Sequence, residues 1–303
     1  MKLVTANRAN KILYNFIQAN NITGKVLLPV NICTDVVATL QYAGLELDFV
    51  DIQADNLCID QEAVLSLAKE ASMLLFVHTY GVENDFYDFF QEVKEVNSEI
   101  VIVDDKCLCM PDLHVEESPA DLVLYSTGAK KMIDLGGGAI GYVADQWKYD
   151  EIKVEPNEYL TNEMWLLDTK QLYIKMDAII AHKEKLNAIY RQNLPKAIQL
   201  PAQYQHWRFN VLTDKKDEIL KALFAEGLFA SSHYAPHTYI HTYIHTYIRA
   251  ENLHKYVVNL FNDQYYTEEQ AIRTCEIINS ILSESLSIPT VTRRSSDSNV
   301  WDD

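Results

Sequence analysis

The chain has 303 residues, which is enough for one large α/β domain and a smaller one. Its 26 basic and 43 acidic residues give a formal net charge of −17, and so acidic a surface excludes nucleic acid as an expected partner. Apolar residues make up 48% of the chain, yet no run of them is long enough to span a bilayer, so we expect no membrane partner. The first residues lack the apolar core of a signal peptide, which predicts a cytoplasmic protein.

The first half of the chain alternates helical patterns with short apolar runs. Helical spacing of apolar residues predicts helices at 7–19, 34–42, 60–68 and 85–96. Apolar runs predict strands at 25–29, 47–50, 73–77, 100–103, 122–125 and 139–143. This alternation predicts an α/β fold with a mostly parallel sheet covered by helices, and with ligands at the carboxyl ends of the strands.

The second half predicts a smaller α/β domain. Its elements are helices at 166–190, 215–226 and 267–286 and a strand at 205–212. We therefore divide the chain into a large domain at 1–165, a connecting helix with a small domain at 166–290, and a disordered tail at 291–303.

Two patterns raise the question of a metal site. The tetrapeptide His-Thr-Tyr-Ile occurs three times in succession, starting at His237, His241 and His245. On a helix these histidines would share one face, but a loop that tolerated expansion is the preferred interpretation. Cys107 and Cys109 form a C-x-C pair without the second pair that a zinc site needs. We predict no metal, and buried thiols rather than disulfides.

Two residues with catalytic potential follow predicted strands. Asp105 comes after an apolar strand, where a carboxylate can face a ligand or simply cap a turn. Lys131 lies five residues after Ser126 and precedes three glycines at 136–138. It could form a Schiff base if burial, or its neighbour Lys130, lowered the pKa of its amine. The alternative is a solvated loop lysine.

An anion site is predicted where the first helix begins. Asn7 and Arg8 precede backbone N–H groups that a helix leaves free, which suits a phosphate. The hydroxyl of Ser126 could join them, although a plain helix cap and a turn serine are the alternatives. His78 follows the strand at 73–77 and could touch a ligand or be structural.

These residues, in this order, resemble the DegT/StrS sugar aminotransferases, fold-type-I enzymes that use pyridoxal 5′-phosphate (PLP). The matching motifs are V-H-T-Y-G at 77–81, an acidic pair at Asp104 and Asp105, Ser126 spaced from Lys131 as in the family, and H-Y-A-P at 233–236. The resemblance covers residues 5–145 well and 165–285 loosely.

The resemblance implies a homodimer in which Lys131 carries PLP and Asp105 pairs with the pyridine nitrogen, so that the ring draws electrons from a substrate carbanion. It implies cofactor contacts from Asn7, Arg8, Cys33 and Ser126, and substrate contacts from His78, His233 and Tyr234. The implied reaction is amino transfer from an amino acid, such as glutamate, to a keto sugar on a nucleotide carrier, for surface polysaccharide.

Several positions depart from the family pattern. Leu108 stands where the family has Gln or His, Gly137 replaces an acidic residue, Cys33 replaces an aromatic that stacks on the cofactor, and Asn162 is a poor match to an asparagine–arginine motif. Two alternatives therefore stay open. One is a degenerate member that binds a sugar nucleotide or a partner without turnover. The other is a PLP-dependent sugar dehydratase, against which the retained Lys131 argues.

Overall fold

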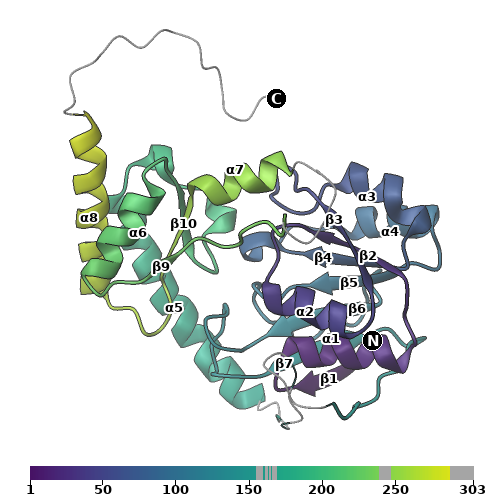
Figure 1. The fold of residues 1–303 in the computed structure, drawn as a ribbon. Helices are drawn as coiled ribbons and strands as arrows, with labels where there is room; N and C mark the ends of the chain where they lie inside the picture. Colours follow the sequence, from purple (N-terminus) through teal and green to yellow (C-terminus); the bar gives the residue numbers. More distant parts are fainter. Residues whose placement is uncertain (155–159, 161–162, 164, 166–168, 239–246, 287–303) are drawn as a thin grey trace.

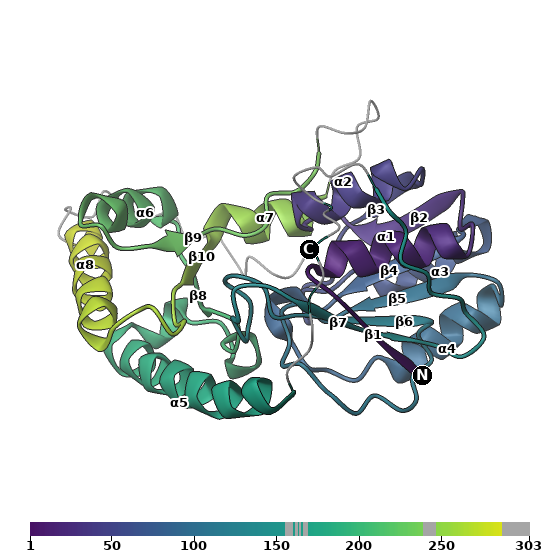
Figure 2. The same ribbon diagram turned by 90° about the horizontal axis from the view of Figure 1, so that it is seen from below.

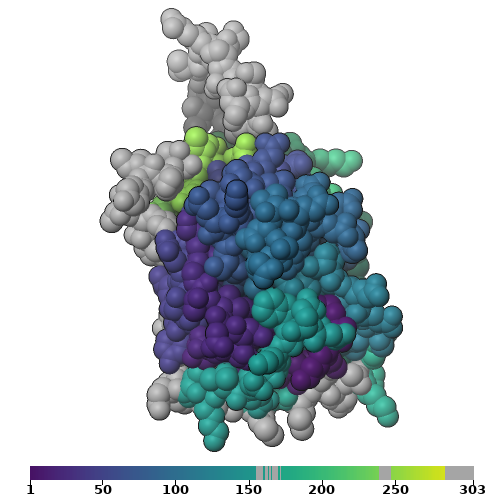
Figure 3. Space-filling model, turned by 90° about the vertical axis from the view of Figure 1, so that its right-hand side faces the viewer, coloured from purple at the N-terminus to yellow at the C-terminus, as the bar shows by residue number. Residues whose placement is uncertain are grey.

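The fold is that of a computed structural model, which describes residues 1–154, 160, 163, 165, 169–238 and 247–286. A large sheet flanked by helices and a small three-stranded sheet are joined by one long helix, α5 (Figures 1 and 2). The predicted α/β class and the helix-covered, mostly parallel sheet are confirmed. On the face shown in Figure 3, residues from the first half of the chain form most of the visible surface.

The large sheet has seven strands in the order β1-β7-β6-β5-β4-β2-β3. Their bounds are β1 Lys2–Ala6, β2 Lys25–Pro29, β3 Glu46–Val50, β4 Met73–Val77, β5 Val101–Asp105, β6 Leu122–Ser126 and β7 Ala139–Val143. Strands β2 to β6 run parallel, whereas β7 pairs antiparallel with both β6 and β1. The strands β4 to β7 are almost wholly buried, as their apolar runs predict.

Four helices cover this sheet: α1 Ala9–Ala19, α2 Thr34–Tyr42, α3 Gln61–Leu67 and α4 Tyr87–Val96. Helix α1 packs on α2 and α3 packs on α4, and the two pairs lie on opposite faces of the sheet (Figures 1 and 2). Asp60 caps α3, since its side chain accepts a hydrogen bond from the Ala63 amide, as the sequence predicts.

The small sheet has the order β8-β10-β9 and is covered by α5, α6 and α8. Its elements are α5 Thr169–Asn193, β8 Phe209–Leu212, α6 Lys216–Ala225, β9 Ala230–Ser231, α7 Ile248–Tyr256, β10 Val257–Leu260 and α8 Glu268–Leu286. Four short 3-10 helices complete the described elements: Ala68–Glu70, Thr79–Gly81, Lys196–Ile198 and Ala202–Tyr204. The small sheet has a hydrophobic core of its own, separate from that of the large sheet.

The predicted division of the chain at residue 165 stays a prediction, and the predicted tail at 291–303 lies outside the described residues. Among the described residues, no helix combines the length and the apolarity needed to cross a bilayer.

Gly81, the last residue of the V-H-T-Y-G motif, has a left-handed backbone with φ +79°. A Cβ atom there would lie 2.3 Å from the Leu108 carbonyl oxygen, so Gly81→Ala should lower the free energy of unfolding by about 3 kcal/mol. Gly44→Ala is the matched control, because Gly44 has φ +90° but open space around it, and should lose only about 1 kcal/mol. Urea unfolding measures both variants, and equal losses would contradict the steric explanation.

Candidate active site

A cavity of about 560 Å³ lies at the carboxyl ends of β4, β5 and β6. It brings together seven of the predicted site residues: Asn7, Arg8, Cys33, Asp105, Ser126, Lys131 and Tyr234. Two predicted substrate contacts, His78 and His233, lie outside it. The seven predicted residues in the cavity come from five separate segments of the chain.

The strand ends supply the floor of the cavity. Val77, Asp105 and Ser126 are the last residues of three parallel strands, so they meet at one edge of the sheet. Asp105 is buried, and one of its carboxylate oxygens accepts a hydrogen bond of 2.9 Å from the Cys107 amide. The Ser126 hydroxyl accepts one of 3.3 Å from the Gly128 amide.

The amino end of α1 forms one wall. The helix begins at Ala9, two residues later than predicted, and Arg8 is its extended N-cap. The first turn contains no acidic residue, so its free N–H groups leave a positive end toward the cavity. The carbonyl of Asn7 accepts a hydrogen bond of 2.8 Å from the Gly138 amide, which ties this helix to the glycine-rich loop.

Lys131 lies in the loop at 127–138, which connects β6 to β7. The Lys131 amide donates to the Gly128 carbonyl, and the two ends of the loop meet where the Thr127 amide donates to the Gly138 carbonyl. Hydrogen bonds therefore close the loop, and the Lys131 side chain lines the cavity instead of extending into solvent.

The pKa of Lys131 is raised, which differs from the sequence-based expectation of a lowered value. Burial lowers the pKa, but negative charge on Tyr234, Cys107, Asp105 and Cys33 would favour the ammonium form, and the net effect is upward. Burial raises the pKa values of the two thiols and of Tyr234, the last to about 12. At neutral pH the Asp105 carboxylate is therefore the neighbour that stabilises a charged Lys131.

His78 is held within the protein, which corrects its prediction as a substrate contact. Its Nε2 lies 2.8 Å from a carboxylate oxygen of Asp104, and its Nδ1 lies 2.7 Å from the Val82 carbonyl oxygen. Only 2% of the residue is exposed. Because alternate residues of a strand face opposite sides of the sheet, Asp104 and its partner lie across the sheet from the cavity that Asp105 faces.

His233 and Tyr234 belong to a segment that runs from the small sheet to the large domain. The His233 amide donates to Asn259, and its carbonyl accepts a hydrogen bond of 2.7 Å from the Tyr80 hydroxyl. The His233 ring packs beside that of Tyr234, with centroids 4.8 Å apart, and His233 does not line the cavity. Its substrate contact stays a prediction. Burial, followed by nearby positive charges with Arg208 the first of them, lowers the pKa of His233 to about 4.

The first histidine of the repeat fixes the far end of this segment. His237 is buried, its Nε2 lies 2.8 Å from the Ile32 carbonyl oxygen, and its ring stacks on Phe49. It lies outside any helix, and His241 and His245 lie outside the described residues. His237 thus has a structural contact beside Cys33 in place of the metal role considered for the repeat.

Asp35, Glu163 and Trp165 are among the lining residues that sequence reasoning missed. A Cβ atom on Gly138 would lie 2.2 Å from the Trp165 ring, so this glycine lets the indole approach the loop closely. The glycine-rich stretch was a sequence signal for such an approach, but the partner could not be identified from it.

Comparisons with known proteins agree with this architecture. No protein-family model and no curated protein matches the chain. Several solved structures match it over most of its length. A DegT/DnrJ/EryC1/StrS aminotransferase from Brucella abortus is 16% identical, with a TM-score of 0.72 over 93% of this chain and 86% of that one. Spr1654 of Streptococcus pneumoniae, named a sugar aminotransferase and solved in its PLP form, is 15% identical, with a TM-score of 0.75 over 94% and 88%.

DesI, solved in the presence of its TDP-sugar product, is 16% identical, with a TM-score of 0.76 over 94% of this chain and 81% of that one. The matches extend over most of both chains, whereas the sequence identities are so low that the matches show only a shared fold. The chain therefore has the fold of the DegT/DnrJ/EryC1/StrS aminotransferases.

Proposed function

We propose that the chain is a PLP-dependent sugar aminotransferase that carries its cofactor on Lys131. The observation that supports this most is that Lys131, Asp105, Ser126 and the amino end of α1 share one cavity. PLP has an aldehyde, a pyridine nitrogen and a phosphate, and these residues offer an amine, a carboxylate, a hydroxyl and free backbone N–H groups. The residues present therefore fit the cofactor.

Each of these residues would contact a different part of the cofactor. When bound, PLP supplies an electron sink for the negative charge that develops at the substrate Cα. Asp105 would hold the pyridine nitrogen in its charged form, while Ser126 and the start of α1 would hold the phosphate. The Lys131 Nζ would hold the cofactor aldehyde only after losing its proton. Once the amine of the donor had displaced it, the freed Nζ would be the base that moves the Cα proton.

We propose glutamate as the amino donor and a nucleotide-linked keto sugar as the acceptor, in the synthesis of surface polysaccharide. The presence of DesI, solved with a TDP-sugar product, among the structural neighbours supports an acceptor of this class. The cytoplasmic location stays a prediction from the sequence.

We also propose a homodimer. Tyr173 and Ile174 on α5 are 47% and 69% exposed, and an apolar pair on that helix would be covered by a second copy. Light scattering should give twice the mass of one chain at micromolar concentration, and the mass of a single chain would refute the dimer.

The test of function separates the two half-reactions. Protein loaded with PLP should lose its visible absorbance band when glutamate is added, and a keto sugar on a nucleotide should restore it. A band that glutamate leaves unchanged would favour the non-catalytic alternative. A restored band with a deoxygenated sugar as the product, rather than an amino sugar, would favour the dehydratase alternative instead.

A further inference from the structure

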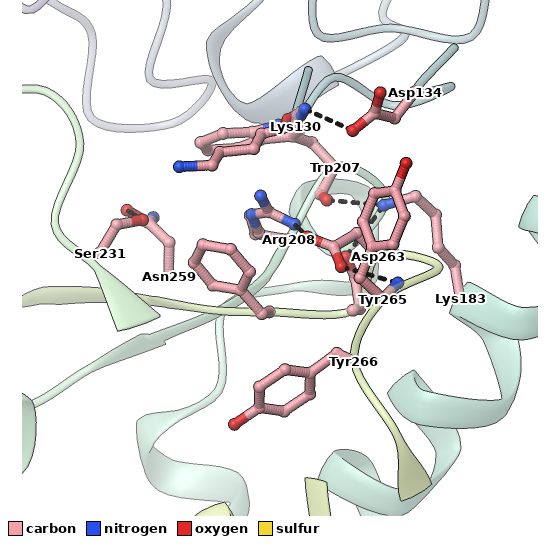
Figure 4. A network of polar contacts seen from close by, with 12 residues as sticks. Lys130, Asp134, Lys183, Trp207, Arg208, Ser231, Asn259, Asp263, Tyr265 and Tyr266 are labelled. Atoms are coloured by element: carbon pink, nitrogen blue, oxygen red, sulfur yellow. Dashed lines mark hydrogen bonds and ion pairs between the residues drawn. The ribbon is translucent and has the colours of Figure 1, made fainter. Parts of the chain in front are cut away.

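The loop that carries Lys131 is tied to the second half of the chain by two side chains. The Trp207 indole N–H donates a hydrogen bond of 2.8 Å to the Lys130 carbonyl, and the Gln264 amide donates one of 3.1 Å to the Asp134 carbonyl. The two contacts span 77 and 130 residues of sequence, and the first is made to the residue directly before Lys131. Figure 4 shows Lys130 and Trp207 side by side.

Lys130 has an unusual backbone that needs such support. Its φ is +63°, in the left-handed region that residues with a side chain disfavour. Its amide donates a hydrogen bond of 2.8 Å to the Asp134 carboxylate, while its carbonyl accepts the bond from Trp207. The two backbone polar groups of Lys130 are thus both fixed, and this reversal of the chain directs Lys131 into the cavity while Lys130 stays exposed.

Trp207 is itself rigidly held. It is 4% exposed, and its ring lies parallel to that of Tyr80, with centroids 6.2 Å apart and 7° between the planes. Its carbonyl accepts a hydrogen bond of 3.0 Å from the Lys183 Nζ, which also donates to Asn262 (Figure 4). Tyr80 comes from the segment after β4 and Lys183 from α5, so Trp207 is held by two distant parts of the chain.

Lys183 is suited to this supporting role because it lies away from the cavity. It is 2% exposed, and its pKa is lowered to about 7. Burial is the main cause, the positive charge of Arg208 adds to it, and the negative charges of Asp263 and Asp134 oppose it. A buried amine that is largely neutral above this pH donates to both of its acceptors without carrying an uncompensated charge.

We propose that Trp207 is a positioning residue, which sets the direction of the Lys131 amine by holding the Lys130 carbonyl. The proposal rests on the proposed role of Lys131. Without the indole N–H, the Lys130 carbonyl loses its partner, the left-handed turn loses one of its two restraints, and the Lys131 Nζ shifts relative to Asp105.

The test is Trp207→Phe, which keeps an aromatic ring against Tyr80 and removes the N–H donor, together with part of the ring volume. The matched control is Trp147→Phe, because the Trp147 indole donates a hydrogen bond of the same length, 2.8 Å, to Asp121 at a site outside the cavity. In the cofactor-free protein, hydrogen exchange of the amides at 128–136 should become roughly five- to tenfold faster in Trp207→Phe. Exchange there should be unchanged in Trp147→Phe.

A second readout uses the loaded protein. The pH midpoint of its visible band reports the lysine-bound cofactor, and it should move by about half a unit or more in Trp207→Phe but not in the control. Unchanged exchange and an unchanged midpoint in Trp207→Phe would overturn the proposal, and so would equal changes in both variants. If the wild type forms no band, the proposed function fails, whereas the exchange result still decides whether Trp207 restrains the loop.

Discussion

Lys131→Ala should lower the rate of amino transfer by roughly 10³-fold or more, since it removes both the covalent carrier and the base for the Cα proton. The Lys131 side chain lines the cavity together with Asp105, and the hydrogen bonds of the loop hold it there. An exposed lysine such as Lys130 therefore cannot take its place. Stopped-flow absorbance after mixing with glutamate measures the first half-reaction directly.

Lys130→Ala is the control for that variant. It removes the same charge one residue away, from a side chain that is exposed and outside the cavity, so the rate should stay within a few-fold of wild type. Equal losses in the two variants would mean that the charge of the loop matters rather than the Lys131 amine. A Lys131→Ala variant with full activity would refute the assignment.

Asp263→Ala should destabilise the protein by about 3–5 kcal/mol, because it leaves the Arg208 guanidinium buried without its counter-ion. Arg208 is 1% exposed, its Nη1 lies 3.0 Å from an Asp263 carboxylate oxygen, and its Nε has no hydrogen-bond partner among the described residues (Figure 4). The guanidinium lies 3.8 Å from the centroid of the Phe261 ring, in a place with little water to solvate it.

Two companion variants make that prediction specific. Glu276→Ala breaks an exposed ion pair with Arg273 and should change the midpoint of urea unfolding very little. The double variant Arg208→Met with Asp263→Leu removes both charges and should recover most of the lost stability. If the double variant is as unstable as Asp263→Ala, the loss comes from packing and not from the unpaired charge.

The sheet could be predicted because its strands are apolar throughout. Runs such as 73–77 and 100–103 have one stable environment, a sheet buried on both faces, and the alternation with helices fixes the parallel order. The strand β1 was missed because its burial is partial and it pairs only with β7, far along the chain. The short strands β9 and β10 and helix α7 were missed because each owes its form to tertiary contacts more than to a local pattern.

The site could be predicted as far as strand ends determine it. Asp105 and Ser126 end parallel strands, so their meeting at one edge follows from topology. His78 was misplaced because a motif gives adjacency in the sequence but not which face of a sheet a side chain takes. The raised pKa of Lys131 and the contact from Trp207 depend on residues that are distant in the sequence, which no local pattern contains.

Mapping the cofactor attachment tests the account most directly. The protein is incubated with PLP, reduced with borohydride, digested, and analysed by mass spectrometry for the peptide that gains a pyridoxyl group. We predict that the group is found on Lys131, and that Lys131→Ala abolishes it while Lys130→Ala does not. A group found mainly on Lys130 or Lys183, or a folded wild-type protein that gains none, would contradict the account.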